Sequence, residues 1–528
     1  MEIQKKWIKK GTCTNFAEYV METTGKSIDE ISRSQFASYE CPGIKESADM
    51  IRQAIADGRE IHVIVDYDAD GINSGAEIYM ILKKLGATMK IIVPKRKKDG
   101  YGINTDMVIN IPDHSLIITI DNGITGVTPI ADAKERGIQV LVLDHHEQNG
   151  PLPNADLIVD PEAFPEGWTF SNYCGAGITY KLAQYLFPDD KDFLAKLSCF
   201  AAIATIGDSV NVTGDNRNIV REGLMNMNRR NCTEGLNAIL DVLKERDKIE
   251  HFGDYELAYK IAPMINAPGR LDDDGGVFVL GTLFRTGEMA KRKAEELYDL
   301  NEKRKEMVNT AIETLQPKGE KIAFLYSEDL EEGLCGIIAG HLASDLHKPA
   351  FVMTKAEGGL IKGSARSEGS TDVLALLTEV KDRLVRFGGH KPAAGFSFEE
   401  KEIKMIFRKL EKKAPEAVTE EIMYYDFDAE VRDLYNIMIN MNKIEIFGVG
   451  LPRPVIRIRS DIQDVRTIGQ DKTHLSFKLG DVKAVAFSMA EKYQNMNCPT
   501  NITVYGNLSE NWWRGKASMQ FQVSDIDL

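Results

Sequence analysis

Long apolar runs are missing from this chain of 528 residues. A membrane-spanning helix needs ~20 consecutive apolar residues, and since no run approaches that length we expect no membrane association. The N-terminus, MEIQKKWIKKGTCTNF, carries lysines without an apolar core behind them, so we also expect no cleaved secretory signal. The composition, 43% hydrophobic and 27% charged, is typical of a globular protein, and the length predicts three or four domains.

Cysteine is scarce, and none of the seven residues belongs to a CxxC pair. This excludes a disulfide framework and the common zinc motifs, and it predicts reduced thiols in the cytoplasm. Basic residues are outnumbered by acidic ones, which gives a net charge of −15. Because nucleic-acid binding depends on local basic patches, the total charge neither supports nor excludes it.

Short β-rich runs alternate with helical stretches between about residues 60 and 210. This rhythm predicts an α/β fold with a mostly parallel sheet covered by helices on both faces. Residues 282–316 predict one long helix, and a second α/β unit follows from 321 to about 398. After about residue 420, five or six short strands and one short helix near 489–495 are typical of a small OB-like β-barrel.

Acidic or histidine residues directly follow three of the apolar runs. The run 61–65 leads into DYDADG (66–71), 116–120 leads into Asp121, and 139–143 leads into Asp144-His145-His146. Because the carboxyl ends of parallel strands meet at one edge of a sheet, we expect these side chains to converge there. Carboxylates and imidazoles together suit a pair of hard divalent cations, which can activate water and hold a phosphodiester.

The acidic segment DYDADG needs a turn and a counter-charge. On one strand face, Asp66, Asp68 and Asp70 would repel one another strongly, so we expect the strand to turn at Gly71 and cations to bind. An acidic surface loop is the plainer interpretation of one such segment. The recurrence of the pattern at three strands, and at Asp208 after the apolar run AAIATIG, favours a metal site.

These motifs resemble the DHH phosphoesterase superfamily, and most closely its RecJ exonuclease family, which acts on single strands in the 5′→3′ direction. The resemblance rests on DYDADG, Asp144-His145-His146 and IGD in this order, and it covers about residues 45 to 510. The pieces that match RecJ more narrowly are VPKRKKDGYG (93–102), INAPGRLDDD (265–274), GLCGIIAGHLA (333–343), IKGSARS (361–367), FGGHKPAAGF (387–396) and IEIFGVGLPRP (444–454).

The resemblance implies five domains or regions. They are an N-terminal segment (1–45), a DHH catalytic domain (46–230), a connecting helical region (231–316), a DHH-associated substrate-binding domain (317–415) and an OB-like nucleic-acid-binding domain (416–528).

The resemblance also implies a catalytic centre with two Mn²⁺ or Mg²⁺ ions. His146 would face the reacting phosphate, and Asp144 would orient the histidines. Some relatives in the superfamily carry a histidine where this chain has Ile64, and Asp66 is then a candidate substitute ligand. The implied metal ligands are Asp68, Asp70, Asp121, His145 and Asp208.

Substrate-binding residues follow from the resemblance in the same way. A pocket for the 5′-phosphate would use guanidinium groups, which bind terminal phosphate bidentately. A glycine-rich turn with His390 would hold a backbone phosphate. A solvated loop is the plainer interpretation of the basic stretch around Arg96. The implied residues are Arg96, Arg270, Ser364, Arg366, Gly388, Gly389 and His390; candidates for a single-strand channel on the barrel are Arg453, Arg457, Arg459, Trp512, Trp513 and Arg514.

The implied activity is 5′→3′ hydrolysis of single-stranded DNA to 5′-mononucleotides by two-metal catalysis, in DNA repair or recombination. The implied enzyme is a monomer, and a helicase and a single-strand-binding protein are its implied partners. Two alternatives stay open. One is a nanoRNase or cyclic-dinucleotide phosphodiesterase on the same pair of domains, and the other is a catalytically inactive replication scaffold.

Overall fold

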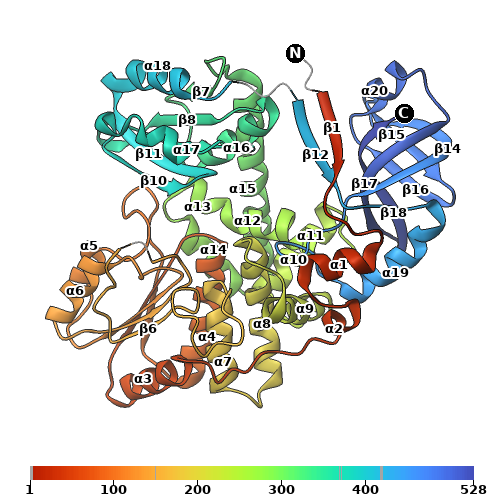
Figure 1. Ribbon diagram of the computed structural model, residues 1–528. Helices are drawn as coiled ribbons and strands as arrows, with labels where there is room; N and C mark the ends of the chain where they lie inside the picture. Colours follow the sequence, from red (N-terminus) through yellow and green to blue (C-terminus); the bar gives the residue numbers. More distant parts are fainter. Residues whose placement is uncertain (1–3, 149, 368, 370, 417–419) are drawn as a thin grey trace. The chain divides into compact units, whose positions relative to one another are not determined.

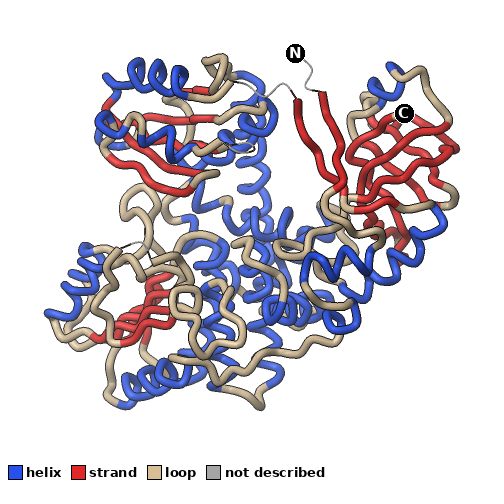
Figure 2. Tube along the Cα trace, viewed as in Figure 1, coloured by secondary structure: helices blue, strands red, loops and turns tan. Residues whose placement is uncertain are grey.

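The computed structural model describes residues 4–148, 150–367, 369, 371–416 and 420–528. These residues form two compact units, and the chain passes between them more than once. Unit 1 contains Val93–Tyr101 and Pro263–Glu421. Unit 2 contains Lys5–Ile92, Gly102–Ala262 and Ile422–Leu528. Figure 1 shows the helices and strands by label, and Figure 2 shows them by type.

A five-stranded parallel sheet with the order β3-β2-β4-β5-β6 lies in unit 2. Its strands β2 and β4 are buried along their whole length, because helices cover both faces of the sheet. The strands are β2 (Ile61–Val65), β3 (Met89–Ile92), β4 (Leu116–Ile120), β5 (Gln139–Leu143) and β6 (Leu157–Val159).

Helix α3 (Ile44–Ala56) precedes the first strand of this sheet, and α4 (Ala69–Leu85), α5 (Thr105–Ile109) and α6 (Val127–Glu135) connect its strands. The helices that follow its last strand are α7 (Gly175–Leu186), α8 (Lys191–Gly207), α9 (Gly214–Asn228) and α10 (Glu234–Arg246). A short helical run follows, made of α11 (Asp254–Glu256) and the π-helix η1 (Leu257–Ile261).

The second part of unit 2 is a β-barrel, closed because β14 pairs with both β15 and β17. Its core also takes in Phe16, Tyr19 and Val20 from α1 (Phe16–Thr24), while α2 (Ile28–Ser32) adds Ile28 and Ile31. The barrel strands are β13 (Phe427–Asp428), β14 (Ile456–Ile468), β15 (His474–Leu479), β16 (Val482–Ala486), β17 (Asn501–Trp513) and β18 (Lys516–Asp527), with helices α19 (Leu434–Ile444) and α20 (Ala490–Asn495). Ahead of it, β1 (Gln4–Lys9) pairs with β12 (Glu420–Tyr425).

Unit 1 has a five-stranded sheet of its own, with the order β10-β11-β9-β8-β7. Only β7 and β8 run parallel. The strands are β7 (Ala323–Tyr326), β8 (Ala350–Lys355), β9 (Leu360–Arg366), β10 (Arg386–His390) and β11 (Ala393–Glu399). The helices are α12 (Ala262–Asn266), α13 (Pro268–Leu271), α14 (Gly275–Leu283), α15 (Gly287–Thr314), α16 (Cys335–Leu346), α17 (Val373–Thr378) and α18 (Ile403–Lys413).

The predicted fold class is confirmed: an α/β domain with a parallel sheet, a second α/β domain and a barrel. The single helix predicted over 282–316 is wrong at its start, because α14 ends at Leu283 and α15 begins at Gly287. Among the described residues, no helix is long and apolar enough to span a bilayer.

Candidate active site

Three acidic residues lie at the carboxyl edge of the parallel sheet in unit 2. Asp66 follows β2, Asp121 follows β4 and Asp144 follows β5, and all three are buried. Because β2, β4 and β5 are parallel neighbours, their ends bring these carboxylates together at the predicted place.

The acidic segment turns earlier than the sequence predicted. Asp68 caps α4, and its Oδ1 accepts hydrogen bonds from the amides of Asp70 (2.9 Å) and Gly71 (3.1 Å). The turn predicted at Gly71 is therefore wrong, because Gly71 already lies in the first turn of the helix. A Cβ on Gly71 would lie 2.3 Å from the carbonyl oxygen of Asp66, so only glycine permits this close approach.

Asp70 is held by the N-terminus of another helix. Its carboxylate accepts hydrogen bonds from the amides of Gly175 (2.6 Å) and Ala176 (2.8 Å) at the start of α7. Unsatisfied amides at a helix N-terminus favour negative charge, so they keep this buried carboxylate in place. The sequence reasoning missed Gly175 and Ala176, although the Gly-Ala-Gly stretch at 175–177 is a signal of close backbone approach.

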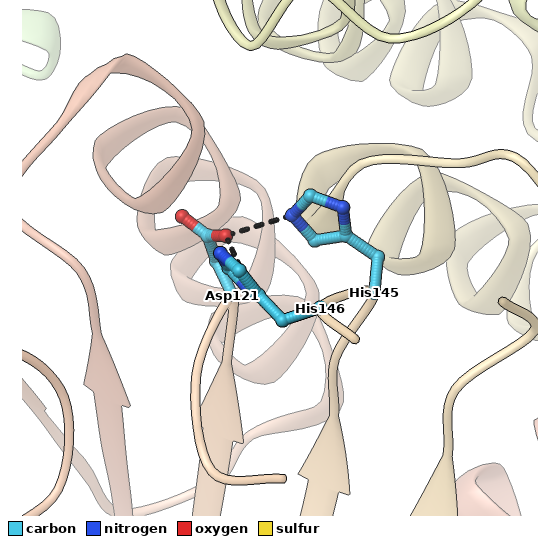
Figure 3. Close-up of side chains that lie close together, drawn as sticks. All are labelled: Asp121, His145 and His146. Atoms are coloured by element: carbon cyan, nitrogen blue, oxygen red, sulfur yellow. Dashed lines mark hydrogen bonds and ion pairs between the residues drawn. The ribbon is translucent and has the colours of Figure 1, made fainter. Parts of the chain in front are cut away.

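The two histidines, which follow β5, both point toward the carboxylate of Asp121 (Figure 3). Nε2 of His145 lies 3.0 Å from Oδ1 of Asp121 and 3.5 Å from Oδ2 of Asp70. The same nitrogen lies 3.8 Å from Oδ2 of Asp208, which follows α8. Nδ1 of His146 lies 3.9 Å from Oδ1 of Asp121.

Asp144 lies behind the histidines and orients them. Its Oδ1 is 2.8 Å from Nδ1 of His146 and accepts a hydrogen bond from the amide of His145 at 2.8 Å. Its Oδ2 accepts a hydrogen bond from the amide of Ile124 at 2.9 Å. Because these donors hold the carboxylate of Asp144 in place, it fixes the orientation of the imidazole of His146.

Three groups of side chains could each hold a metal ion, with ligand atoms within 4.8 Å of one another. Asp121 belongs to two of the groups and His145 to two. The groups are Asp121, His145 and His146; Asp70, His145 and Asp208; and Asp66, Asp68 and Asp121. Asp121 also has a backbone φ of 62°, in the left-handed region that non-glycine residues adopt infrequently.

The electrostatics of this cluster fit divalent cations. Burial and the charges of Asp70, Asp68 and Asp66 raise the pKa of Asp121 well above its usual value. Burial and the nearby aspartates raise the pKa of Asp208 to about 8. A cation removes this repulsion, and a donor set of carboxylate oxygens and imidazole nitrogens suits Mn²⁺ and Mg²⁺.

The protonation of the two histidines differs. Burial lowers the pKa of His145, which keeps the imidazole neutral as a metal ligand requires. Burial would also lower the pKa of His146, but the hydrogen bond and charge of Asp144 raise it to about 9. One histidine thus suits metal ligation, and the other can carry a proton.

Unit 1 brings the predicted phosphate-binding residues near one another. Nε of Arg96 donates to the carbonyl of Gly269 (3.1 Å), and Nη1 of Arg270 donates to the carbonyl of Gly333 (3.2 Å). A Cβ on Gly336, in the first turn of α16, would lie 3.0 Å from Nη2 of Arg366 and 3.4 Å from Oγ of Ser364. A helix N-terminus beside a guanidinium and a hydroxyl is a suitable site for a phosphate.

The glycine-rich segment is a strand, so the predicted turn at Gly388, Gly389 and His390 is wrong. These residues lie in β10, and β11 separates this strand from β9. His390 of β10 and Arg366 of β9 lie opposite the same residue of β11, and so do Gly388 and Ser364. Since opposed residues share a face, one side of the sheet presents all four positions.

The residues predicted on the barrel are largely engaged within unit 2. Nη2 of Arg453 pairs with Asp254 at 2.8 Å, and the Trp512 ring stacks on His251 with centroids 4.9 Å apart. Nε of Arg457 pairs with Asp428, Nε of Arg459 donates to Asn501, and the amide of Arg514 donates to Glu250. Trp513 ends β17, and its side chain lies outside the described residues.

Three family models match the chain in the order of these domains. They are the DHH family N-terminal domain (residues 60–206), the DHHA1 domain (319–416) and the RecJ OB domain (425–525). The chain therefore has the fold of a DHH-type phosphoesterase, followed by a barrel of the RecJ type.

Comparison with individual curated relatives identifies the family of the chain more narrowly. The chain is 30% identical to the single-stranded-DNA-specific exonuclease RecJ of Escherichia coli over 75% of its length and 73% of that protein. It is 32% identical to RecJ of Bacillus subtilis over 92% of its length, but it spans 64% of that longer relative. The chain belongs to the RecJ family.

Solved structures agree with this membership. RecJ of Thermus thermophilus in complex with Mn²⁺ shares the fold, with a TM-score of 0.82, 24% identity and coverage of 99% of this chain and 79% of that one. An exonuclease RecJ bound to manganese matches with a TM-score of 0.62 and 28% identity, over 71% of this chain and 96% of that one.

Proposed function

We propose that this chain hydrolyses single-stranded DNA from the 5′ end and releases 5′-mononucleotides. The observation that carries the proposal is the convergence of the aspartates and histidines at one sheet edge, in a chain of the RecJ family. Its relatives in Bacillus subtilis and Escherichia coli are single-stranded-DNA-specific exonucleases.

The residues that would hold two Mn²⁺ or Mg²⁺ ions are Asp66, Asp68, Asp70, Asp121, His145 and Asp208. Such ions, when bound, supply an activated water and neutralise the charge of the reacting phosphate. Asp66 belongs to this set because it groups with Asp68 and Asp121, in a chain that has Ile64 where some superfamily members have histidine.

His146 would act on the substrate and not as a metal ligand alone. Its Nδ1 is engaged by Asp144, so the proton that it would present to a phosphate oxygen is the one on Nε2. Against the effect of burial, the hydrogen bond and the charge of Asp144 raise the pKa of His146 and so favour the protonated imidazole. A proton presented there would stabilise the negative charge that grows on the leaving-group oxygen as its bond to phosphorus breaks.

The selection of the 5′ end would come from unit 1. Arg96, Arg270, Ser364 and Arg366 would bind the terminal phosphate, aided by the N-terminal amides of α16. Gly388 and His390 would contact a further phosphate from the face that also presents Ser364 and Arg366, and Gly389 between them would contribute its backbone amide. Because the substrate is single-stranded, a helicase or a single-strand-binding protein would supply it.

Digestion of a 5′-phosphorylated, end-labelled DNA strand with Mn²⁺ tests this function. We expect the 5′-label to appear at once as a mononucleotide, and the 3′-labelled strand to shorten in single-nucleotide steps. A phosphorylated dinucleotide, a cyclic dinucleotide, an RNA strand and a duplex serve as comparison substrates. Attack from the 3′ end, or hydrolysis confined to dinucleotides, would refute the proposal.

A further inference from the structure

The segment 251–262 joins the barrel to the carboxylate cluster within unit 2. At its start, Asp254 accepts hydrogen bonds from the amide of Phe447 (2.7 Å) and from Nη2 of Arg453 (2.8 Å). At its end, a Cβ on Gly207 would lie 3.1 Å from the Cβ of Ala262. Gly207 directly precedes Asp208, so this segment begins at the barrel and ends beside a predicted metal ligand.

Two tyrosines of this segment are exposed and face each other. The side chains of Tyr255 and Tyr259 are 55% and 63% exposed, and their ring centroids lie 4.8 Å apart at an interplanar angle of 37°. Their spacing of four residues places them on one side of the helical run. Leu257 and Ile261 bury the opposite side, so packing of the segment does not require the tyrosines.

The backbone at this place is unusual. Tyr259 lies within the π-helix η1, a wide turn that occurs often at functional sites and seldom elsewhere. Farther back, His251 stacks on Trp512 of β17 with an interplanar angle of 19°. Aromatic rings therefore recur at 251, 255 and 259 along the segment.

The acidic side chains around these rings are mostly occupied by donors. Glu250 accepts hydrogen bonds from the amides of Arg514 and Gly515, and Asp247 pairs with Lys260 at 2.7 Å. Asp254 is occupied by Arg453. The two exposed rings offer π faces, on which nucleobases can stack.

We propose that Tyr255 and Tyr259 form a base-stacking platform for the single strand between the barrel and the metal centre. The inference rests on the proposed function and deepens it, because the segment that carries the two rings begins at the barrel and ends beside Asp208. Every base has a π face, so the platform binds the strand without regard to sequence. A single strand is the occupant because the segment is continuous with the barrel, which matches the RecJ OB domain, and with the carboxylate cluster.

Equilibrium binding of a 5′-phosphorylated 20-nucleotide thymidine strand tests the platform, with Asp121→Asn in all proteins to prevent hydrolysis. We expect Tyr255→Ala/Tyr259→Ala to weaken binding about 10- to 100-fold. The double Phe variant keeps both rings and should bind within about 2-fold of the parent. The slope of affinity against salt should not change, because stacking releases no counterions.

Tyr435→Ala is the matched control, since Tyr435 is 59% exposed on α19 of the same unit. It should leave binding unchanged.

Photo-crosslinking to a strand carrying 5-iodouracil supplies a readout independent of affinity. Crosslinks at Tyr255 or Tyr259 support the platform. Unchanged affinity of the double Ala variant, or crosslinks confined to other residues, overturns it while the nuclease assignment stands. If the unmodified chain neither binds nor digests the strand, the proposed function and the platform fall together.

Discussion

Asp121 is the residue on which the candidate centre depends most. It is shared by two of the three possible ion-binding groups, and its backbone has a φ of 62°. Burial and the charges of the surrounding aspartates together raise the pKa of Asp121 well above its usual value. Strain and charge repulsion at one buried position are costs that a bound cation would offset.

Asp121→Asn tests this residue with the least disturbance. Asparagine has the same shape and also tolerates the left-handed backbone, so the fold should survive. Loss of the shared negative charge should lower the rate of strand hydrolysis roughly 1,000-fold. The measurement is initial rate together with Mn²⁺ binding by calorimetry. Asp189→Asn, at an exposed position, is the control, and a variant rate within about 10-fold of the parent would contradict the assignment.

Arg366→Lys tests the phosphate site of unit 1. Lysine keeps the positive charge but loses the planar fork that binds phosphate through two nitrogens. We expect kcat/KM on a 5′-phosphorylated strand to fall about 10- to 100-fold, and the preference over a 5′-hydroxyl strand to disappear. Arg383→Lys, which retains its partner Glu402, should behave as the parent. An unchanged ratio of the two rates would exclude Arg366 from end recognition.

At the scale of elements, the centre depends on how two helix N-termini meet the sheet edge. α4 begins at Ala69 and is capped by Asp68, while α7 begins at Gly175 and holds Asp70 with its amides. A Cβ on Gly175 would lie 2.8 Å from the Cβ of Asp121 and 3.1 Å from Oδ2 of Asp70. The start of α7 thus approaches the carboxylates too closely for any side chain.

Gly175→Ala should therefore damage the centre although it adds one methyl group. We expect a loss of about 1–3 kcal/mol in the free energy of unfolding and weaker Mn²⁺ binding. Gly340→Ala is the control, because a Cβ there meets nothing within 4 Å inside α16 and should be neutral or stabilising by up to about 1 kcal/mol. Thermal unfolding measures both. Equal stability of the two variants would show that α7 can move away from the aspartates.

At the scale of the whole molecule, the carboxylate cluster belongs to unit 2 and the phosphate site to unit 1. Ligands that bind the native state stabilise the unit that holds their site. Hydrogen exchange with and without Mn²⁺ can separate the two units, since local stability differs across a structure.

Mn²⁺ should slow exchange at the ends of β2, β4 and β5 and at the starts of α4 and α7. At 100 times the dissociation constant, the stabilisation of unit 2 should approach about 2.7 kcal/mol. The sheet of unit 1 should exchange at the same rate with or without the ion. If Mn²⁺ slows hydrogen exchange equally in both units, or still slows it in Asp121→Asn, the result would argue against an ion at the carboxyl edge of the parallel sheet.

Much of this organisation could be predicted from local patterns. Apolar runs followed by acidic residues predicted β2, β4 and β5 with their terminal carboxylates, because burial and strand direction follow from nearby residues. The turn after Asp66 and the strand at Gly388 could not be predicted in the same way. Gly71 lies in a helix because it packs on the backbone of Asp66, and β10 is a strand because β11 pairs with it.

The order of the family domains, the strand ends and the candidate metal ligands can be identified from the sequence alone, since they depend on residue types and on spacing along the chain. How these parts meet depends on the tertiary structure. It brought the amides of Gly175 and Ala176 to Asp70, bound Arg453 to Asp254, and left Tyr255 and Tyr259 exposed beside each other. Such contacts join segments far apart in the chain or depend on which helix face is buried, and neighbouring residues along the sequence do not encode them.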